Sequence, residues 1–353
     1  MLNLDWYKGR RVLVTGHTGF KGSWMCRLLK KAGAEVTGYA LDAPTDPSLF
    51  ALSSLAEDMH DVRGDVRDLE RMQNMFQQAR PEVVIHLAAQ PIVRESYREP
   101  RLTYETNVMG TVNLFECVRH TPSVRSVVNV TTDKVYLNRE WPWGYREDEM
   151  LDGFDPYSNS KSCSELVTHS YVSSFFSTAD APAVSTARAG NVIGGGDFAM
   201  DRIIPDCVRA VTRGETIRIR NPYSTRPYQH VLEPVCAYLM IAQCQAEDKG
   251  KAGWYNVGPD DASCVTTGDL VSMFVQAWGE GACWENVSEV NAPHEAHFLK
   301  LDCSKIKTVF SWKPVWGIEE AVGKTVEWTK AWVNHRNIAD ETDREIDAYL
   351  QEM

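Results

Sequence analysis

The sequence predicts an α/β protein in which a doubly wound parallel sheet carries a smaller, partly discontinuous C-terminal lobe. Short apolar strands alternate with amphipathic helices along the first 190 residues. A glycine-rich turn lies between the first strand and the first helix. Polar side chains follow several strands directly, and ligands bind at the carboxyl ends of the strands in such sheets. These three observations predict a ligand-binding edge formed by the first half of the chain.

The first half of the chain supplies the elements of this sheet in order. Residues 11–15, RVLVT, are read as a short buried strand, and WMCRLLKKAG as a helix that ends at Gly33. Further strands are expected within 35–42, 81–89, 126–136 and 181–191, and the third strand is expected to end within 62–68. The strand in 126–136 is followed by its exit loop. Helices are expected at 69–79, 102–120 and 156–176. Strand and helix therefore alternate as in a sheet covered on both faces.

After residue 191 the alternation loosens into turn-rich pieces. The segment 231–245 predicts an amphipathic helix and GWYNVG a short strand, either of which could pack back on the first domain. The charged tail, 331–353, predicts a surface helix. We therefore expect a first domain over residues 1–190, with returning segments near 231–258, and a second lobe mainly over 191–353.

Composition and charge exclude several classes of protein. Of 353 residues, 43% are hydrophobic and 24% charged, the balance of a soluble globular protein. No apolar run approaches a membrane span, and MLNLDWYKGRR lacks the apolar core of a secretion signal. Nine cysteines without a CxxC pair argue against disulfides and zinc, and a net charge of −11 argues against nucleic acid. We expect a cytoplasmic protein with no metal, nucleic acid or membrane partner.

The turn after the first strand carries Gly16, Gly19 and Gly22 in a GxxGxxG pattern. Glycines permit a tight turn and a close approach of the backbone to a pyrophosphate, and the following helix N-terminus supplies free N–H groups. The position of this motif between a strand and a helix predicts a Rossmann-like dinucleotide site.

Two acidic residues follow the next strands. Asp42 lies 26 residues after Gly16, where a carboxylate accepts hydrogen bonds from ribose hydroxyls and repels a 2′-phosphate, which favours NAD over NADP. The alternative is a solvated loop acid before Pro44. Asp65 is expected to reach the adenine amine, although acids at such places are also often helix caps, as Asp68 is expected to be.

The sequence YSNSK places Tyr157 and Lys161 on one face of a helix. A nearby ammonium favours tyrosinate and is expected to lower the pKa of the phenol. Such a tyrosine takes the proton of a hydroxyl while hydride leaves the same carbon. Hydroxyl, carboxylate and amine groups also meet in TTDKVY, where Thr132, Asp133 and Lys134 follow the fifth strand.

Together, TGHTGFKG, HLAAQP, ETNVMGT, TTDKVY, YSNSK and ARAGNVIGGGD resemble the extended short-chain dehydrogenase/reductase superfamily, and most of all its nucleotide-sugar 4,6-dehydratases. The resemblance runs from residue 10 to about 316. The residues TDK, with VIGGGDFAMDRIIPD and RPYQHV, are similar to the CDP-glucose 4,6-dehydratases. The dTDP-glucose enzymes have Asp and Glu after the catalytic Thr, whereas this chain has Asp133 and Lys134.

The resemblance implies a lyase that uses a tightly held NAD. CDP-D-glucose would be oxidised at C4, lose water across C5–C6 and regain hydride at C6, giving CDP-4-dehydro-6-deoxy-D-glucose for deoxysugar and O-antigen lipopolysaccharide synthesis. Thr132, Tyr157 and Lys161 would act at C4, and Asp133 would protonate the leaving hydroxyl. Lys134 would act either as a neutral base at C5 or as a charged stabiliser of the enolate.

The resemblance also implies the residues around each ligand. Around the cofactor we expect Gly16, Thr18, Gly19, Phe20, Lys21, Gly22, Asp42, Asp65, Val66, Leu87, Ala88, Ala89, Asn107, Thr131, Tyr157 and Lys161. Around the substrate we expect Gln90, Asn191, Arg202, Arg220, Arg226 and His297. The arginines are expected there because guanidinium groups fork to phosphate oxygens, with a solvated surface charge as the alternative for Arg220. For Tyr228 and His230, the alternative to a place at the substrate is a packing role with satisfied polar ends.

Three alternatives remain open. The chain is another dehydratase, acting on a dTDP- or GDP-sugar, or a 4-epimerase of the same superfamily, or a non-catalytic NAD-binding regulator. Relatives in the superfamily usually dimerise through two long helices, for which 102–120 and 157–176 are the candidates here. We therefore expect a homodimer or tetramer.

Overall fold

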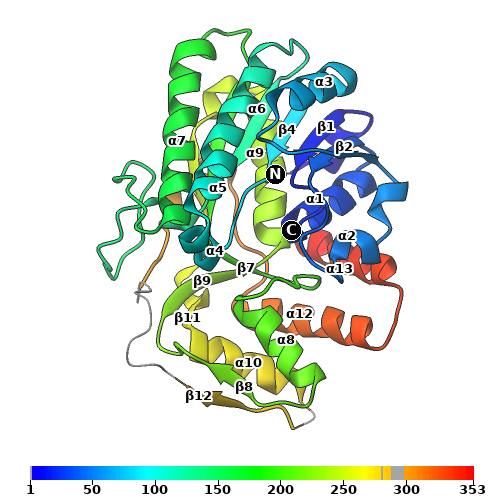
Figure 1. Cartoon of the computed structure of the whole chain (residues 1–353), viewed down its shortest axis with the longest axis vertical. Helices are drawn as coiled ribbons and strands as arrows, with labels where there is room; N and C mark the ends of the chain where they lie inside the picture. Colours follow the sequence, from blue (N-terminus) through cyan, green and yellow to red (C-terminus); the bar gives the residue numbers. More distant parts are fainter. Residues whose placement is uncertain (1, 280, 288–297) are drawn as a thin grey trace.

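The centre of the computed structural model, which describes residues 2–279, 281–287 and 298–353, is a seven-stranded parallel sheet (Figure 1). Its strand order is β10-β6-β5-β4-β1-β2-β3. The strands are β1 (Arg11–Thr15), β2 (Glu35–Ala40), β3 (His60–Arg63), β4 (Val83–His86), β5 (Ser126–Val130), β6 (Ala183–Ala189) and β10 (Trp254–Val257). The predicted fold class is confirmed, and every predicted strand is present. The third strand ends at Arg63, within the segment 62–68 where its end was expected.

The order of the sheet reverses at β1, which pairs with β2 on one side and β4 on the other. Thr15 at the end of β1 pairs with both Tyr39 and His86. The loops after β1 and β4 leave in different directions from this point, and crevices of this kind hold ligands in parallel sheets. Topology therefore places the glycine turn at the ligand-binding edge.

Both faces of the sheet are buried, because alternate residues of each strand enter different cores. Val12 and Val14 belong to one hydrophobic cluster, and Leu13 belongs to another. The first cluster includes α1 (Phe20–Lys31) and α9 (Leu232–Glu247), and the second includes α3 (Leu69–Ala79) and α6 (Gly110–Arg119). The remaining helices of this domain are α2 (Leu49–Leu52), α4 (Val93–Arg98), α5 (Pro100–Tyr104) and α7 (Pro156–Phe175). A π-helical turn, Glu105–Met109, joins α5 to α6.

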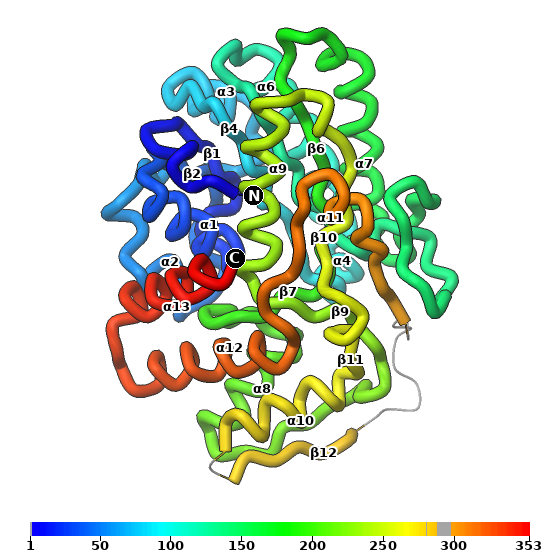
Figure 2. The backbone as a smooth tube through the Cα atoms, turned by 180° about the vertical axis from the view of Figure 1, so that it is seen from behind, coloured from blue at the N-terminus to red at the C-terminus, as the bar shows by residue number. Residues whose placement is uncertain are grey.

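The helix predicted at 231–245 is present as α9, but the prediction that it is amphipathic is wrong. Nearly all of its side chains are buried, because it lies against β5 and β6 on one side and the C-terminal segment on the other. Figure 2 shows α9 along the back of the sheet. The strand β10 extends the sheet beside β6. Both segments therefore return from the second half of the chain to the first domain.

The second lobe has its own core and lies below the main sheet in Figure 1. It contains a three-stranded sheet, β11-β9-β7, and a two-stranded sheet, β12-β8. These strands are β7 (Asn191–Ile193), β8 (Ile217–Ile219), β9 (Thr225–His230), β11 (Cys264–Thr266) and β12 (Trp284–Asn286). The helices of this half are α8 (Ile203–Thr212), α10 (Thr267–Trp278), α11 (Ser304–Phe310), α12 (Ile318–Val333) and α13 (Ile338–Glu352).

The tail helix α13 is not purely a surface helix. Ile346 and Tyr349 are buried, and the helix packs on α1 of the first domain. The Tyr349 hydroxyl donates to the buried Glu233 of α9 at 2.7 Å. The end of the chain therefore fastens the second lobe back onto the sheet domain.

All nine cysteines are free thiols. Within the described part of the chain, no helix is long and apolar enough to cross a membrane.

Candidate active site

The glycine turn has three glycines that are required for different reasons. Gly16 has a positive φ of 75°, and a Cβ there would lie 2.7 Å from the amide nitrogen of Ala88. A Cβ on Gly22 would lie 2.1 Å from the Gly16 carbonyl oxygen. A Cβ on Gly19 would meet only that oxygen, at an ordinary 3.4 Å. Packing of the chain thus explains Gly16 and Gly22, while Gly19 leaves space in front of the N-terminus of α1, which has no side-chain cap.

Two hydroxyl groups hold the turn on the sheet edge. The Thr15 hydroxyl lies 2.7 Å from Nδ1 of His86 and accepts a hydrogen bond from the Ala88 amide at 3.2 Å. The Thr18 hydroxyl donates to the Leu41 carbonyl at 3.0 Å. His86 is buried, and burial, aided by the Lys161 charge, lowers its pKa to about 3. A neutral His86 therefore braces the turn, a role that the sequence reasoning missed.

The acids expected at the adenosine end differ in their surroundings. Asp42 follows β2 with a side chain that is 96% exposed, and its carboxylate is 3.6 Å from Arg63. The Asp65 carboxylate accepts hydrogen bonds from the backbone and guanidinium of Arg67, which hold its pKa below the usual range despite partial burial. Asp68 caps α3, as expected, by accepting from the Arg71 amide. Val66 is buried behind this loop.

Asn107 lies in the π-helical turn and crosslinks three segments. Its Oδ1 accepts from the Gln90 amide at 2.8 Å, and its Nδ2 donates to the Gln90 carbonyl and to the Ser160 hydroxyl. The Gln90 side chain donates to Thr103 and accepts from the Ile92 amide. The loop after β4, which contains the half-buried Leu87, Ala88 and Ala89, is thereby tied to α7. The amide group of Gln90, which is expected at the substrate, thus bonds to Thr103 of α5 and to the Ile92 amide.

The residues after β5 form a short 3-10 turn, η4 (Asp133–Val135), with Thr132 as its N-cap. The Thr132 hydroxyl donates to Oδ1 of Asp133 at 3.0 Å. Asp133 is 1% exposed, and its Oδ2 has no hydrogen-bond partner in the described ranges of the chain. Burial raises the pKa of Asp133, although Lys134 and Thr132 oppose this. A buried carboxyl of this kind holds its proton more readily than a solvated one, as a general acid must.

Tyr157 lies in the first turn of α7, which begins at Pro156 and is capped by Asp155. The expected lowering of the phenol pKa is not found, because burial raises the pKa of Tyr157 to about 12, with Thr132 opposing. Lys161 donates from Nζ to the Val130 carbonyl at 3.1 Å. Burial lowers the pKa of Lys161 to about 8. Burial therefore decides the pKa of both groups, and the i,i+4 spacing of Tyr157 and Lys161 does not.

Cationic side chains from both halves of the chain converge on Asp133. Lys134, Arg226 and Lys21 all interact electrostatically with its carboxylate. Burial and the charges of Arg202 and Lys161 lower the pKa of Lys21 to about 8. The site thus combines the glycine turn, the end of β5 and the second lobe, an arrangement that suits an anionic ligand.

Arg202 and Arg220, which are expected at the substrate, each pair with an aspartate of the second lobe. Arg202 is the N-cap residue of α8 and donates to Asp197 at 3.0 Å. Arg220 lies 3.6 Å from Asp201 and is half exposed, and Asn191 opens β7. His297 lies outside the described residues. Tyr228 is buried and its hydroxyl lies 3.2 Å from that of Thr267, which fits the packing alternative.

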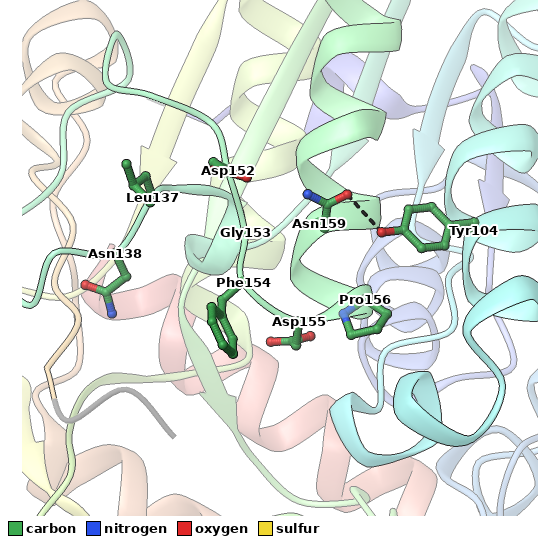
Figure 3. A pocket seen from close by; sticks show the side chains of 9 residues that line it. All are labelled: Tyr104, Leu137, Asn138, Asp152, Gly153, Phe154, Asp155, Pro156 and Asn159. Atoms are coloured by element: carbon green, nitrogen blue, oxygen red, sulfur yellow. Dashed lines mark hydrogen bonds between the residues drawn. The ribbon is translucent and has the colours of Figure 1, made fainter. Parts of the chain in front are cut away.

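A cavity of about 420 Å³ lies beside the first turn of α7 (Figure 3). On one side Tyr104 donates to Asn159 at 2.9 Å, and on the other side lie Leu137 and Asn138. The segment 152–156 lies between these two sides and also lines the cavity, and Phe154 in it is 78% exposed. The sequence reasoning missed this cavity, although Asn159 in its lining belongs to the YSNSK motif, because the residues 137–138 and 152–155 that line most of the rest of it carry no recognisable pattern.

The sequence reasoning also missed a buried ion pair between Glu165 of α7 and Arg188 of β6. The signal was available: Glu165 repeats the helical spacing of Tyr157 and Lys161, and Arg188 is a charge within an apolar strand. Thr131, expected at the cofactor, donates its hydroxyl proton to Glu165 at 2.5 Å.

Comparisons with known proteins show the family and the fold of the chain. The sequence profile described as GDP-mannose 4,6 dehydratase matches residues 13–325. The chain is 49% identical to a CDP-glucose 4,6-dehydratase of Salmonella typhimurium, over 99% of both chains. Among solved structures, a dTDP-glucose 4,6-dehydratase of Bacillus anthracis in complex with NAD superposes with a TM-score of 0.76 at 22% identity, covering 94% of this chain and 100% of that one. A UDP-glucose 4-epimerase of Thermotoga maritima with UDP-glucose gives 0.78 at 23% identity, covering 91% and 99%. The two structural likenesses show the fold.

Proposed function

Because the chain belongs to the GDP-mannose 4,6 dehydratase family, we propose that it is a hydro-lyase that converts CDP-D-glucose to CDP-4-dehydro-6-deoxy-D-glucose. The substrate is proposed from the 49% identity to a CDP-glucose 4,6-dehydratase over 99% of both chains. The observation that carries the reaction type is the buried Asp133, which has a free carboxylate oxygen within the described structure and lies next to Thr132. An acid at this place is needed to lose water and is not needed to epimerise C4.

We propose NAD as the cofactor, held by the turn at Gly16–Gly22 and the residues expected around it. The space in front of Gly19 and the uncapped N-terminus of α1 fit a pyrophosphate. The exposed carboxylate of Asp42 fits ribose hydroxyls. NAD, when bound, supplies a hydride acceptor at the start of the reaction and a hydride donor at its end.

The first task of the chain is to manage the proton of the sugar 4-hydroxyl. Tyr157 is proposed to take that proton, and Thr132 to hold the same oxygen. A phenol with a pKa near 12 is a poor base at neutral pH, so neighbouring cations must help it to ionise. Arg202 lowers the pKa of Tyr157, and Lys161, four residues later on the same helix, is proposed to add its charge while it is protonated.

The second task is to remove water across C5–C6. Asp133 is proposed to give its proton to the leaving 6-hydroxyl, for which its raised pKa suits it. Lys134 is half-buried beside it and is proposed to handle the C5 proton, either as a base or by stabilising the enolate with its charge. Gln90, Asn191, Arg202, Arg220, Arg226 and His297 are proposed to hold the nucleotide and its diphosphate.

The proposal also covers the roles of the two domains, the location of the enzyme and its oligomeric state. Residues 1–190, with the returning segment near 231–258, would hold the cofactor, and 191–353 would mainly hold the substrate. The protein is proposed to act in the cytoplasm as a homodimer or tetramer, in deoxysugar synthesis for O-antigen lipopolysaccharide.

Incubation with single sugar nucleotides tests the substrate. CDP-glucose should give a 4-keto product that absorbs after alkali treatment, while dTDP-glucose and GDP-mannose give little. Product from dTDP-glucose alone would refute the nucleotide assignment. A 4-epimer without any keto product would refute dehydration and favour the epimerase alternative.

The variant Tyr157→Phe tests whether the fold is catalytic or only regulatory. Loss of the phenol should lower kcat by roughly 10²–10⁴-fold, the usual range for a general base. Its thermal melting point and NAD affinity should remain near those of the wild type. Unchanged turnover would show that Tyr157 takes no part in the chemistry.

A further inference from the structure

A buried ion pair lies directly behind the proposed catalytic side chains and has no role in the steps above. Glu165 is on α7, four residues after Lys161, and Arg188 is on β6. Both side chains are fully buried, and Nη2 of Arg188 lies 2.9 Å from Oε2 of Glu165. The pair therefore joins the helix that carries Tyr157 and Lys161 to the sheet.

Each member of the pair anchors one end of the segment Thr132–Lys134. Before it, the Thr131 hydroxyl donates to Oε1 of Glu165 at 2.5 Å. After it, the Tyr136 hydroxyl accepts from Nη1 of Arg188 at 2.8 Å and donates to Asn256 at 2.7 Å. One buried pair thus holds both ends of this segment.

Stability alone does not account for such a pair. Removing two charges from water is costly, and apolar replacements of buried ion pairs are often neutral or stabilising. Burial by itself would raise the pKa of Glu165, but Arg188, His169 and Thr131 bring it to about 2. Glu165 therefore stays ionised at working pH and is a fixed acceptor rather than a proton donor. What the pair supplies is a fixed geometry.

We propose that Glu165 and Arg188 are positioning residues that hold Thr132 and Asp133 in register with Tyr157. The catalytic meaning of this register rests on the proposed function. The anchoring itself involves only the chain and can be measured without substrate.

Two threonines on the same carboxylate give a matched pair of variants. Thr131 follows β5 and donates to Oε1, while Thr186 on β6 donates to Oε2 at 2.7 Å. Both are buried, and valine replaces either side chain with nearly the same shape. Thr131→Val releases the segment that contains Asp133, whereas Thr186→Val removes a comparable hydrogen bond that leads only into β6.

Hydrogen exchange measured by mass spectrometry is the first readout. Peptides covering 131–137 should exchange at least about fivefold faster in Thr131→Val than in the wild type, because the anchored segment opens locally. The same peptides in Thr186→Val should exchange as in the wild type. Melting points of both variants are recorded, so that a general loss of stability is separated from local release.

Turnover of CDP-glucose is the second readout. Thr131→Val should lower kcat by on the order of 10–100-fold while KM stays within about threefold, because misplaced catalytic groups slow chemistry more than binding. Thr131→Ser should restore kcat, since it keeps the hydroxyl. Thr186→Val should keep kcat near the wild-type value. Tyr136→Phe frees the other end of the segment and should change exchange and kcat as Thr131→Val does. It replaces Thr131→Val as the test if that variant fails to fold.

Equal effects of Thr131→Val and Thr186→Val on exchange would overturn the proposal and leave the pair with a purely structural part. Unchanged exchange at 131–137 in both Thr131→Val and Tyr136→Phe would do so as well. A wild type that turns over no sugar nucleotide would refute the proposed function instead, and the exchange comparison would still decide the positioning.

Discussion

Protonation of Tyr157 and Lys161 is decided by how much water the fold leaves around them. Their spacing on one helix face predicts that they are neighbours, and both lie on the inner face of α7. It does not predict the pKa, because burial raises that of the phenol to about 12 and lowers that of the amine to about 8. The sequence reveals which groups meet, whereas the degree of burial depends on segments far away in the chain.

Lys161 should therefore cost stability at neutral pH. Below pH 8 the folded protein holds an ammonium in a dry site, and this cost disappears as pH rises from about 8 towards 10.5, where the folded state loses its proton before the unfolded state does. Lys161→Met should raise the free energy of unfolding at pH 7 by up to about 3 kcal/mol and abolish turnover. Its advantage should shrink by pH 10.

Thermal unfolding of both proteins at the two pH values checks this expectation. Lys8→Met, at an exposed lysine, is the control and should change little at either pH. A Lys161→Met protein that melts below the wild type at pH 7 would show that the hydrogen bond to the Val130 carbonyl outweighs the cost of burial.

At the scale of elements, alternation of apolar strands and helices predicted the sheet well. The six strands expected in the first half are all present, since a strand buried on both faces reads as a short apolar run. The segment 231–245 was interpreted wrongly as amphipathic, because the residues that cover the outer face of α9 lie in the C-terminal segment, far away in the sequence. Similarly, Gln90 was expected at the substrate, but its hydrogen bonds to Thr103 and the Ile92 amide were not predicted, because they depend on how α5 packs on the loop after β4.

The glycine turn gives a prediction that separates cofactor binding from folding. Gly19→Ala introduces a Cβ that the chain accommodates, but which projects into the space proposed for pyrophosphate. NAD affinity, measured by calorimetry, should fall at least about tenfold, with a melting point close to the wild type when no NAD is added. Gly317 has the same N-cap backbone conformation and open surroundings, so Gly317→Ala should change neither quantity. Equal NAD affinities for all three proteins would place the pyrophosphate elsewhere.

At the scale of the whole molecule, helix α7 buries polar side chains and exposes apolar ones. Small polar residues and the charged pair of α7 are buried, whereas Leu166 is 53% and Phe175 46% exposed. Met109, at the end of the π-helical turn that packs on α7, is 49% exposed. Leu166 and Phe175 are nine residues apart and therefore lie on opposite sides of α7, so they do not form one apolar face. In the proposed homodimer we expect the exposed Leu166 to lie in the interface.

Leu166→Glu should therefore convert a dimer to a monomer, because a carboxylate would be buried between helices without a partner. Light scattering after size-exclusion chromatography measures the mass. Val309→Glu is the matched control, since Val309 on α11 is also an exposed aliphatic residue, 37% exposed, on another part of the molecule. A dimer that survives Leu166→Glu would place the interface on another surface.

The π-helical turn at Glu105–Met109 determines how the helices α5 and α6, which it joins, would respond to the loss of a residue. It accommodates one residue more than a regular helix would between α5 and α6. Deleting a single residue there would let the hydrogen bonds close in the ordinary pattern and would leave the later side chains in phase, whereas the same deletion in a regular helix would turn every later side chain by about 100° around the axis. Phe115 would therefore stay in the core that it shares with Val118, but Asn107, inside the turn, would lose its position opposite Ser160. A shortening by one residue would thus preserve the packing of the helix and remove only the crosslink that the turn carries.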